Sequence, residues 1–210
     1  MSALEEPRAP RSTAKGRAAQ RRVIEQALVL FQARGFHATS IREVAQAAGM
    51  AKATVYHHFQ TKGALLYAIH DVFMETLEEG MAEIIASGRP AEERLRAIIQ
   101  DLWRVMVTHR SHVHVFFEEW RYLDDESLRA LKPRRDAYFR FLRDTVAEVL
   151  EADGRSLGQE HVDVLTLGIF GMCNWGYQWF EEDGPLAAGG IADDYADLVI
   201  AGFRGGAPGG

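Results

Sequence analysis

The sequence predicts an all-α fold. Several stretches repeat apolar residues at the i, i+3, i+4 and i+7 spacing of a helix that buries one face, and no stretch sustains the apolar–polar alternation of a strand. Glycines, prolines and capping residues interrupt these stretches where helices would begin or end. We therefore expect about nine helices, divided between a small N-terminal domain of three helices and a larger C-terminal helical domain.

The N-terminal helices are marked by their start and stop signals. A first helix is expected over residues 17–34, where an apolar stripe ends at a glycine. Ser40 and Glu43 have the three-residue spacing of a capping box, which predicts the start of a second helix. A short third helix is expected over 52–58. Thr61 can then cap a long fourth helix.

Five further helices are expected in the C-terminal part. They begin after Pro90 and then cover residues 112–122, 128–150, 161–180 and 191–203. Pro133 either kinks the helix over 128–150 or lies in the first turn of a helix that restarts there. The helix over 161–180 is apolar on most of its circumference, which predicts burial on more than one side.

Composition and helix signals together give four segments. We expect a disordered tail over residues 1–14, the three-helix domain over 15–62, the larger domain over 63–204 and a flexible glycine-rich end over 205–210.

Charge is distributed unevenly along the 210 residues. The net charge is −6, but residues 1–67 carry ten Lys and Arg against four Asp and Glu, a net charge of +6, and the remainder has a net charge of −12. A basic segment joined to an acidic body indicates that one end meets a polyanion. The single cysteine, Cys173, excludes an internal disulfide and a Cys-rich zinc site. With no apolar run of membrane-spanning length and no apolar signal core, a cytoplasmic protein is expected.

Residues 40–62 have the spacing of a helix-turn-helix motif, in which two short helices join at Gly49. The second helix, over 52–58, is short and slender enough to enter the major groove of DNA. Its polar side chains supply hydrogen-bond donors: Lys52, Thr54, Tyr56, His57 and His58. Arg42 and Lys62 flank it on the neighbouring helices. We therefore expect contact with double-stranded DNA.

This stretch closely resembles the TetR family of transcriptional regulators over about residues 17–70. The resemblance is carried by Thr39-Ser40-Ile41-Arg42-Glu43-Val44-Ala45-Gln46-Ala47-Ala48-Gly49 and Ala53-Thr54-Val55-Tyr56-His57-His58-Phe59-Gln60-Thr61-Lys62. It implies a homodimer on a palindromic operator. By position, the DNA backbone contacts are Tyr56, His58 and Lys62, and the residues that reach base edges are Arg42, Lys52, Ala53 and Thr54. The full DNA-binding set is Thr39, Ser40, Arg42, Lys52, Ala53, Thr54, Tyr56, His57, His58 and Lys62.

Two departures from the family pattern lie close to this motif. Ala51 stands where the family usually has Ser or Thr capping the recognition helix, which removes a side-chain phosphate contact. Gly63 and Ala64 replace the acidic residues that are common after Lys62.

The segment 167–180 is unusual for a helix because it combines three glycines with a cluster of aromatic residues. An interior glycine costs about 1 kcal/mol relative to alanine, so either a partner helix or a ligand is expected to approach closely, with an aromatic core helix as the alternative. The segment is similar to the C-terminal domain of TetR regulators of fatty-acid, phenylacetate and steroid catabolism. That resemblance implies a CoA thioester as effector. Gln178 stands where many of these regulators have Arg.

An effector pocket is expected along the long fourth helix. Its apolar and aromatic lining would need few polar anchors. The predicted effector-binding residues are Phe73, Leu77, Leu102, Trp103, Met106, Arg110, Phe117, Trp120, Arg121, Phe170, Asn174, Trp175 and Trp179. The nearest cations in sequence for a CoA head are Arg104, Arg110 and Arg121.

The sequence therefore predicts a regulator, most simply a repressor, that leaves DNA when a hydrophobic effector binds. We expect no enzyme, cofactor or membrane partner, and no metal site, because no third ligand falls in step with His114 and Glu118. The homodimer is expected to form through the helices around 138–150 and 162–180. The alternatives are a multidrug-type TetR sensor, an all-α enzyme acting on acyl substrates, and a nucleoid-type DNA binder without an effector.

Overall fold

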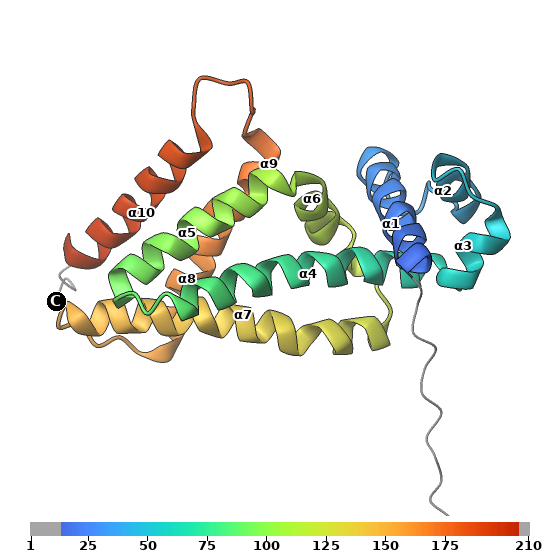
Figure 1. Ribbon diagram of the computed structural model, residues 1–210. Helices are drawn as coiled ribbons and strands as arrows, with labels where there is room; N and C mark the ends of the chain where they lie inside the picture. Colours follow the sequence, from blue (N-terminus) through green and yellow to red (C-terminus); the bar gives the residue numbers. More distant parts are fainter. Residues whose placement is uncertain (1–13, 206–210) are drawn as a thin grey trace, which may run out of the picture. The chain divides into compact units, whose positions relative to one another are not determined.

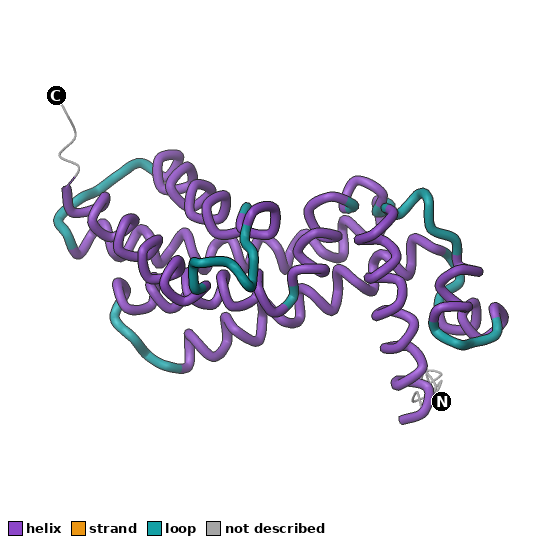
Figure 2. Tube along the Cα trace, turned by 90° about the horizontal axis from the view of Figure 1, so that it is seen from above, coloured by secondary structure: helices purple, strands orange, loops and turns teal. Residues whose placement is uncertain are grey.

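The computed structural model describes residues 14–205, and every regular element within them is helical (Figures 1 and 2). The elements are α1 (Ala14–Arg34), α2 (Ile41–Ala47), α3 (Lys52–His58), α4 (Lys62–Ala86), α5 (Ala91–Thr108), α6 (Arg110–Glu118), the 3-10 turn η1 (Trp120–Tyr122), α7 (Asp125–Ala152), α8 (Gln159–Asn174), α9 (Gly176–Trp179) and α10 (Ala188–Gly205). The all-α prediction is confirmed. Residues 1–13 and 206–210, where both tails were expected, lie outside the described residues.

The chain divides into two compact units, one ending at Leu65 and the other beginning at Leu66. The sequence-based boundary after Lys62 falls three residues before this division, at the start of α4. No helix of the described residues is both long and apolar enough to cross a membrane.

The core of the N-terminal unit is formed by one buried face of each of the helices α1, α2 and α3. Val23, Ala27 and Phe31 of α1 are fully buried, as are Val44 of α2 and Val55 of α3. These side chains follow the helical period, so that one face of each helix packs into a shared core and the opposite face stays in solvent. The core thereby fixes which side of α3 is presented outward.

The second unit is organised around α5, which lies against α7, α8 and α10. Its inward stripe repeats at helical spacing and is fully buried at Leu95, Ile99 and Met106. Trp103 lies on the same helix and packs edge-to-face against Trp179, Phe180 and Tyr195. This arrangement places the α5 stripe at the centre of the unit.

The structure decides between alternatives in one long segment and corrects the prediction in another. The helix α7 continues through Pro133, which is its ninth residue, so of the two alternatives the restart is excluded. The predicted helix over 161–180 breaks at Trp175 into α8 and the short α9. A Cβ atom on Gly176 would lie 2.8 Å from Met106 Cε, so that glycine allows close packing of α9 on α5.

One face of α8 is open in the protomer, against the expectation of burial on several sides. Val162, Thr166, Ile169 and Cys173 point inward, whereas Leu167 is 59% exposed. The thiol of Cys173 is fully buried, and burial raises its pKa to about 12.

An arginine clamp joins α7 to α4 within the second unit. Arg134 Nη1 donates to Asp71 at 2.5 Å, and its Nε and Nη2 donate to the two carboxylate oxygens of Glu78 at 2.6 and 2.7 Å. Such fork-shaped pairs fix orientation as well as charge. The clamp acts together with the buried stripe of α7, which includes Leu131, Tyr138 and Leu142, to hold α7 against its neighbours.

Candidate DNA-binding surface and effector cavity

The outward face of α3 carries the polar residues expected of a recognition helix. Lys52, Ala53, Thr54, Tyr56 and His57 are exposed, and buried Val55 anchors the helix between them. Lys52 Nζ lies 5.4 Å from the centroid of the Tyr56 ring. An α-helix that shows donors on one side and is fixed from the other has the form needed for major-groove reading.

The turn before α3 has the geometry of the motif but lacks a side-chain cap. Gly49 has a φ of +66°, a conformation that favours glycine, and it reverses the chain between α2 and α3. Ala51 occupies the N-cap of α3 and forms no side-chain cap hydrogen bond. The first N–H groups of α3 therefore have no side-chain acceptor from the N-cap residue.

The residues at the start of α2 serve the fold of the unit. Thr39 is buried, and its hydroxyl donates to the carbonyls of Leu30 and Gly35 at 3.3 and 3.0 Å. Ser40 caps α2 in a complete capping box with Glu43. Arg42 is exposed on the first turn.

Lys62 is held by three main-chain oxygens. Its ammonium donates to the carbonyls of Phe36, His37 and Thr39 at 2.8, 3.4 and 3.0 Å, and Nζ lies 4.2 Å from the centroid of the Phe36 ring. These bonds tie the loop before α2 to the first residue of α4. All three donors of the ammonium are thus directed to main-chain carbonyls in this structure.

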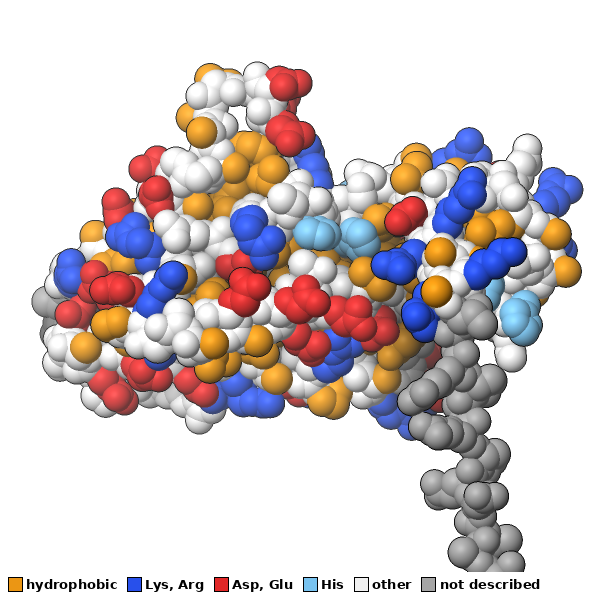
Figure 3. Space-filling model, in the orientation of Figure 1, with side chains coloured by type: hydrophobic (Ala, Val, Ile, Leu, Met, Phe, Trp, Pro, Cys, Tyr) orange, Lys and Arg blue, Asp and Glu red, His pale blue; other side chains and the backbone are white. Residues whose placement is uncertain are grey.

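The surface charges follow the sequence asymmetry. On the face seen in Figure 3, Lys and Arg prevail over Asp and Glu on the N-terminal unit, whereas acidic side chains are frequent on the second unit. Because DNA is a polyanion, the basic unit is the one suited to meet it.

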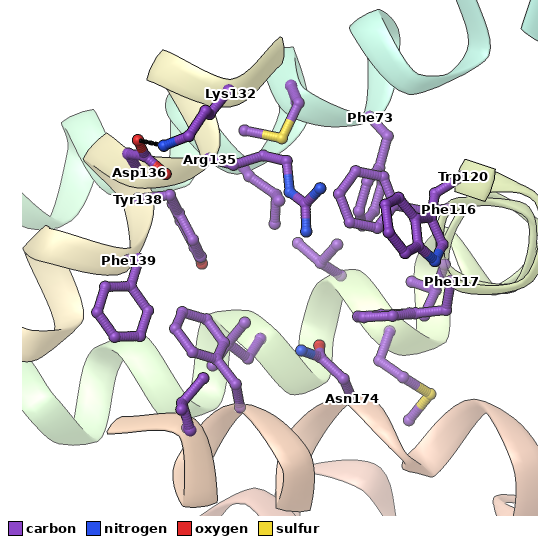
Figure 4. A pocket seen from close by; sticks show the side chains of 18 of the residues that line it. Phe73, Phe116, Phe117, Trp120, Lys132, Arg135, Asp136, Tyr138, Phe139 and Asn174 are labelled. Carbon is purple, nitrogen blue, oxygen red and sulfur yellow. Dashed lines mark hydrogen bonds and ion pairs between the residues drawn. The ribbon is translucent and has the colours of Figure 1, made fainter. Parts of the chain in front are cut away.

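A cavity of about 610 Å³ lies within the second unit, between α4, α5, α6, α7 and α8. This volume is within the range of sites for small ligands. Figure 4 shows aromatic rings from α4 and α6 along one side, Tyr138 and Phe139 of α7 on the opposite side, and Asn174 projecting from α8 below. The lining residues are Phe73, Met74, Leu77, Leu102, Val105, Met106, Val113, Phe116, Phe117, Trp120, Leu128, Lys132, Arg135, Asp136, Tyr138, Phe139, Leu167, Phe170 and Asn174.

The structure brings eight of the sequence-predicted effector residues together around this cavity. They come from five elements and are Phe73, Leu77, Leu102, Met106, Phe117, Trp120, Phe170 and Asn174.

Five others lie elsewhere. Trp103 and Trp179 pack on each other, with ring centroids 5.7 Å apart, and Trp175 is 60% exposed. Arg110 donates two hydrogen bonds to the carbonyl of Tyr177 at 3.1 and 2.9 Å. Arg121 donates to the carbonyl of Glu118 at 3.0 and 2.9 Å.

The cations expected beside a CoA head are thus engaged in the fold. Arg104, the third of them, pairs with Asp101 at 2.6 Å. The cations that line the cavity are Lys132 and Arg135 of α7, which sequence reasoning missed. Their spacing could have indicated them, because it places both on the same face of the α7 helix as Leu128, Tyr138 and Phe139.

Three histidines lie near the aromatic side of the cavity without forming a metal site. His70 is buried and His112 stacks on Phe73, with ring centroids 6.3 Å apart. Burial, and the neighbouring His109 and His70, lower the pKa of His112 to about 4. In residues 14–205 no group of three or more His, Cys, Asp or Glu could hold a metal ion.

Comparison with known proteins agrees with both units. A family model described as bacterial regulatory proteins of the tetR family matches residues 23–69, and one described as a tetracyclin repressor-like C-terminal domain matches residues 88–203. The HTH-type transcriptional repressor KstR2 of Rhodococcus jostii (strain RHA1) is 25% identical over 195 residues, covering 92% of this chain and 96% of that protein.

Solved structures are similar along most of the chain. The structure of AibR in complex with isovaleryl coenzyme A and operator DNA has a TM-score of 0.77 and 29% identity, covering 87% of this chain and 98% of that one. The TetR family transcriptional regulator PfmR from Thermus thermophilus has a TM-score of 0.76 and 28% identity, covering 86% and 97%. With a helix-turn-helix unit and a cavity-bearing helical unit each matched by its own family model, the chain belongs to the TetR family of bacterial regulatory proteins.

Proposed function

We propose that the protein is a transcriptional repressor that binds a palindromic operator as a homodimer and leaves it when a hydrophobic effector enters the cavity of the second unit. One observation carries this proposal: one chain contains a recognition helix with an exposed polar face and, in a separate unit, an apolar cavity of about 610 Å³. A DNA binder without an effector has no need of such a cavity.

A CoA thioester is the effector that we propose. The lining is mainly aliphatic and aromatic, which suits an acyl or aryl chain. A relative of 29% identity was solved with isovaleryl coenzyme A and operator DNA, which supports the same ligand class here.

The homodimer is proposed to form through the open face of α8 and the adjoining α10. Val164 and Leu167 of α8 and Leu198 of α10 are each about 60% exposed, and a Cβ atom on Gly168 or Gly171 would meet nothing within 4 Å. The apolar residues of α7 that sequence analysis assigned to this interface face the core of their own unit instead. Small residues flanked by apolar ones allow two copies of a helix to approach closely.

The proposed switch depends on a difference in affinity. An effector releases the protein only if it binds the DNA-incompetent conformation more tightly than the DNA-bound one, because equal affinity shifts no population. A roughly 100-fold preference would correspond to about 2.7 kcal/mol of coupling.

Titration of the operator complex tests this function. DNA from upstream of the gene would be bound by the full chain, and a panel of acyl-CoA thioesters, free CoA, free acids and hydrophobic drugs would be added at micromolar concentration. We expect an acyl-CoA to release the protein and free CoA to leave it bound. Release by drugs alone would indicate multidrug sensing, and absence of any DNA binding would contradict the proposed function.

A further inference from the structure

The effector cavity contains one cation that the fold does not neutralise. Arg135 of α7 lines the cavity, and it forms no hydrogen bond or ion pair with any residue between 14 and 205. Its guanidinium carbon lies 5.4 Å from the centroid of the Phe116 ring, which is another lining residue. Figure 4 shows the side chain extending from α7 into the cavity, toward Phe116 and Asn174.

The neighbouring charges on α7 are already paired. Lys132 Nζ donates to Asp136 at 2.5 Å, and in Figure 4 these two side chains turn toward each other. Arg134, the residue before Arg135, is clamped to Asp71 and Glu78 of α4. Successive residues of a helix point about 100° apart, so Arg134 contacts α4 while Arg135 lies on the cavity side of α7.

Arg135 is exposed, so its guanidinium lies at the solvent-accessible side of the cavity and stays hydrated in the absence of a ligand. A ligand that covers it against the apolar lining excludes water from the contact, which strengthens the interaction of the guanidinium with an anionic group. Guanidinium presents its donors in a fixed fork, which matches the two oxygens of a carboxylate or the oxygens of a phosphate. The aromatic ring of Phe116 supports the face of the guanidinium and leaves the N–H edges available.

We propose that the cavity selects an amphipathic anion, whose negatively charged group is bound by Arg135 while its apolar part occupies the aromatic and aliphatic lining. This inference rests on the proposed effector site and adds to it the polarity of the ligand and the residue that reads it. Neutral hydrophobic molecules of the same shape are then poor ligands.

A matched pair of fluorescent probes tests the proposal without DNA. 8-Anilinonaphthalene-1-sulfonate and N-phenyl-1-naphthylamine share an aromatic skeleton, but only the first carries an anionic group. Titrated into the full chain, the sulfonate is expected to bind more tightly than the neutral amine. Arg135→Gln should weaken sulfonate binding by about 10- to 100-fold, the range for a lost charge-assisted hydrogen bond, and should leave amine binding unchanged.

Two further variants separate charge from packing. Arg140→Gln removes an exposed arginine of the same helix that does not line the cavity, and it should change neither affinity. Asp136→Asn removes the carboxylate that neutralises Lys132, and it should strengthen sulfonate binding. If the two substitutions only disturbed the structure, Arg135→Gln and Asp136→Asn would not change the affinity for the sulfonate in opposite directions.

The outcomes are distinct. Equal binding of both probes, equal loss of both in Arg135→Gln, or no saturable binding of the sulfonate would overturn the inference. Displacement of the sulfonate by dodecanoate or by dodecanoyl-CoA then shows whether a carboxylate or a phosphate supplies the anion. Because these measurements use the free protein, failure of operator release would contradict the proposed function and leave the Arg135 result intact.

Discussion

Lys62 shows that a motif residue can be recognised from sequence although its contacts cannot be predicted from it. The sequence places a lysine at the start of the long fourth helix, which is where the family resemblance puts a DNA backbone contact. The structure directs its ammonium to three carbonyls of the loop over 36–39. Those carbonyls lie more than twenty residues away in sequence, so no local pattern predicts the contact.

Substitution of Lys62 separates these two roles. Lys62→Ala should lower the free energy of unfolding of the N-terminal unit by about 1–3 kcal/mol, because it leaves part-buried carbonyls without a charged donor. It should also weaken binding to all DNA sequences, with the slope of log affinity against log salt unchanged. Urea denaturation and salt-dependent DNA titration measure both quantities.

The matched variant is Lys52→Ala on the exposed face of α3. It should leave stability unchanged and reduce the salt slope by roughly 1, as expected for one lost phosphate contact. If Lys62→Ala reduced the salt slope and left stability unchanged, Lys62 would be a direct DNA contact.

At the scale of helices, start signals were predictable and interruptions were not. Ser40 and Thr61 each accept a hydrogen bond from a backbone N–H of the helix that follows, as local sequence indicates. The sequence left open whether the helix runs through Pro133 or restarts there, and it did not indicate the break of the 161–180 segment at Trp175.

The α2 capping box predicts a pH-dependent contribution to stability. The hydroxyl and N–H of Ser40 both donate to Glu43, which holds the pKa of that carboxyl below its ordinary value of 4.5. A lowered folded-state pKa gives stability that is present above the unfolded value and lost as pH falls through the folded one. Ser40→Ala should therefore destabilise by about 1 kcal/mol at pH 7, and by less below pH 4.5.

Thermal or urea unfolding of the wild type and of Ser40→Ala, at pH values from about 3 to about 7, measures how this stability difference changes with pH. Ser87→Ala is a suitable control, because the Ser87 hydroxyl donates to the carbonyl of Ile84 and meets no carboxylate. A Ser40→Ala difference that stayed constant with pH would argue against the coupling to Glu43.

At the scale of the molecule, the sequence predicted the cavity's apolar wall better than its charges. Phe73, Leu77, Leu102 and Met106 follow from helical periodicity, because one face of α4 and α5 must be buried. The contribution of α7 was not predicted, since it depends on how α7 packs against α4, which includes contacts of Arg134 to residues more than fifty positions away in sequence. The two tryptophans at 175 and 179 suggested a binding site, but both are exposed, and the second packs on Trp103 instead of lining the cavity.

Assembly of the proposed homodimer is tested by a substitution that the protomer tolerates. Gly168→Leu adds a side chain where the protomer leaves open space, and it replaces a poor helix former by a good one. The protomer should therefore remain folded and at least as stable, while the dimer dissociates and operator binding falls. Sedimentation at micromolar concentration and thermal unfolding measure the two effects.

Ile85→Glu serves as the control because Ile85, at the end of α4, is also an exposed apolar residue and lies outside the α8–α10 face. It should leave the dimer intact. A wild-type chain that sediments as a monomer would contradict the proposed assembly.

The reaction rate of the buried Cys173 thiol reports how often the second unit opens. It is the single cysteine of the chain, and burial both shields it and keeps it protonated at neutral pH. A thiol-reactive reagent can therefore modify the protein only during moments when α8 separates from its neighbours. The modification rate therefore measures how often α8 separates from its neighbours. A ligand that stabilises the closed cavity would lower that rate.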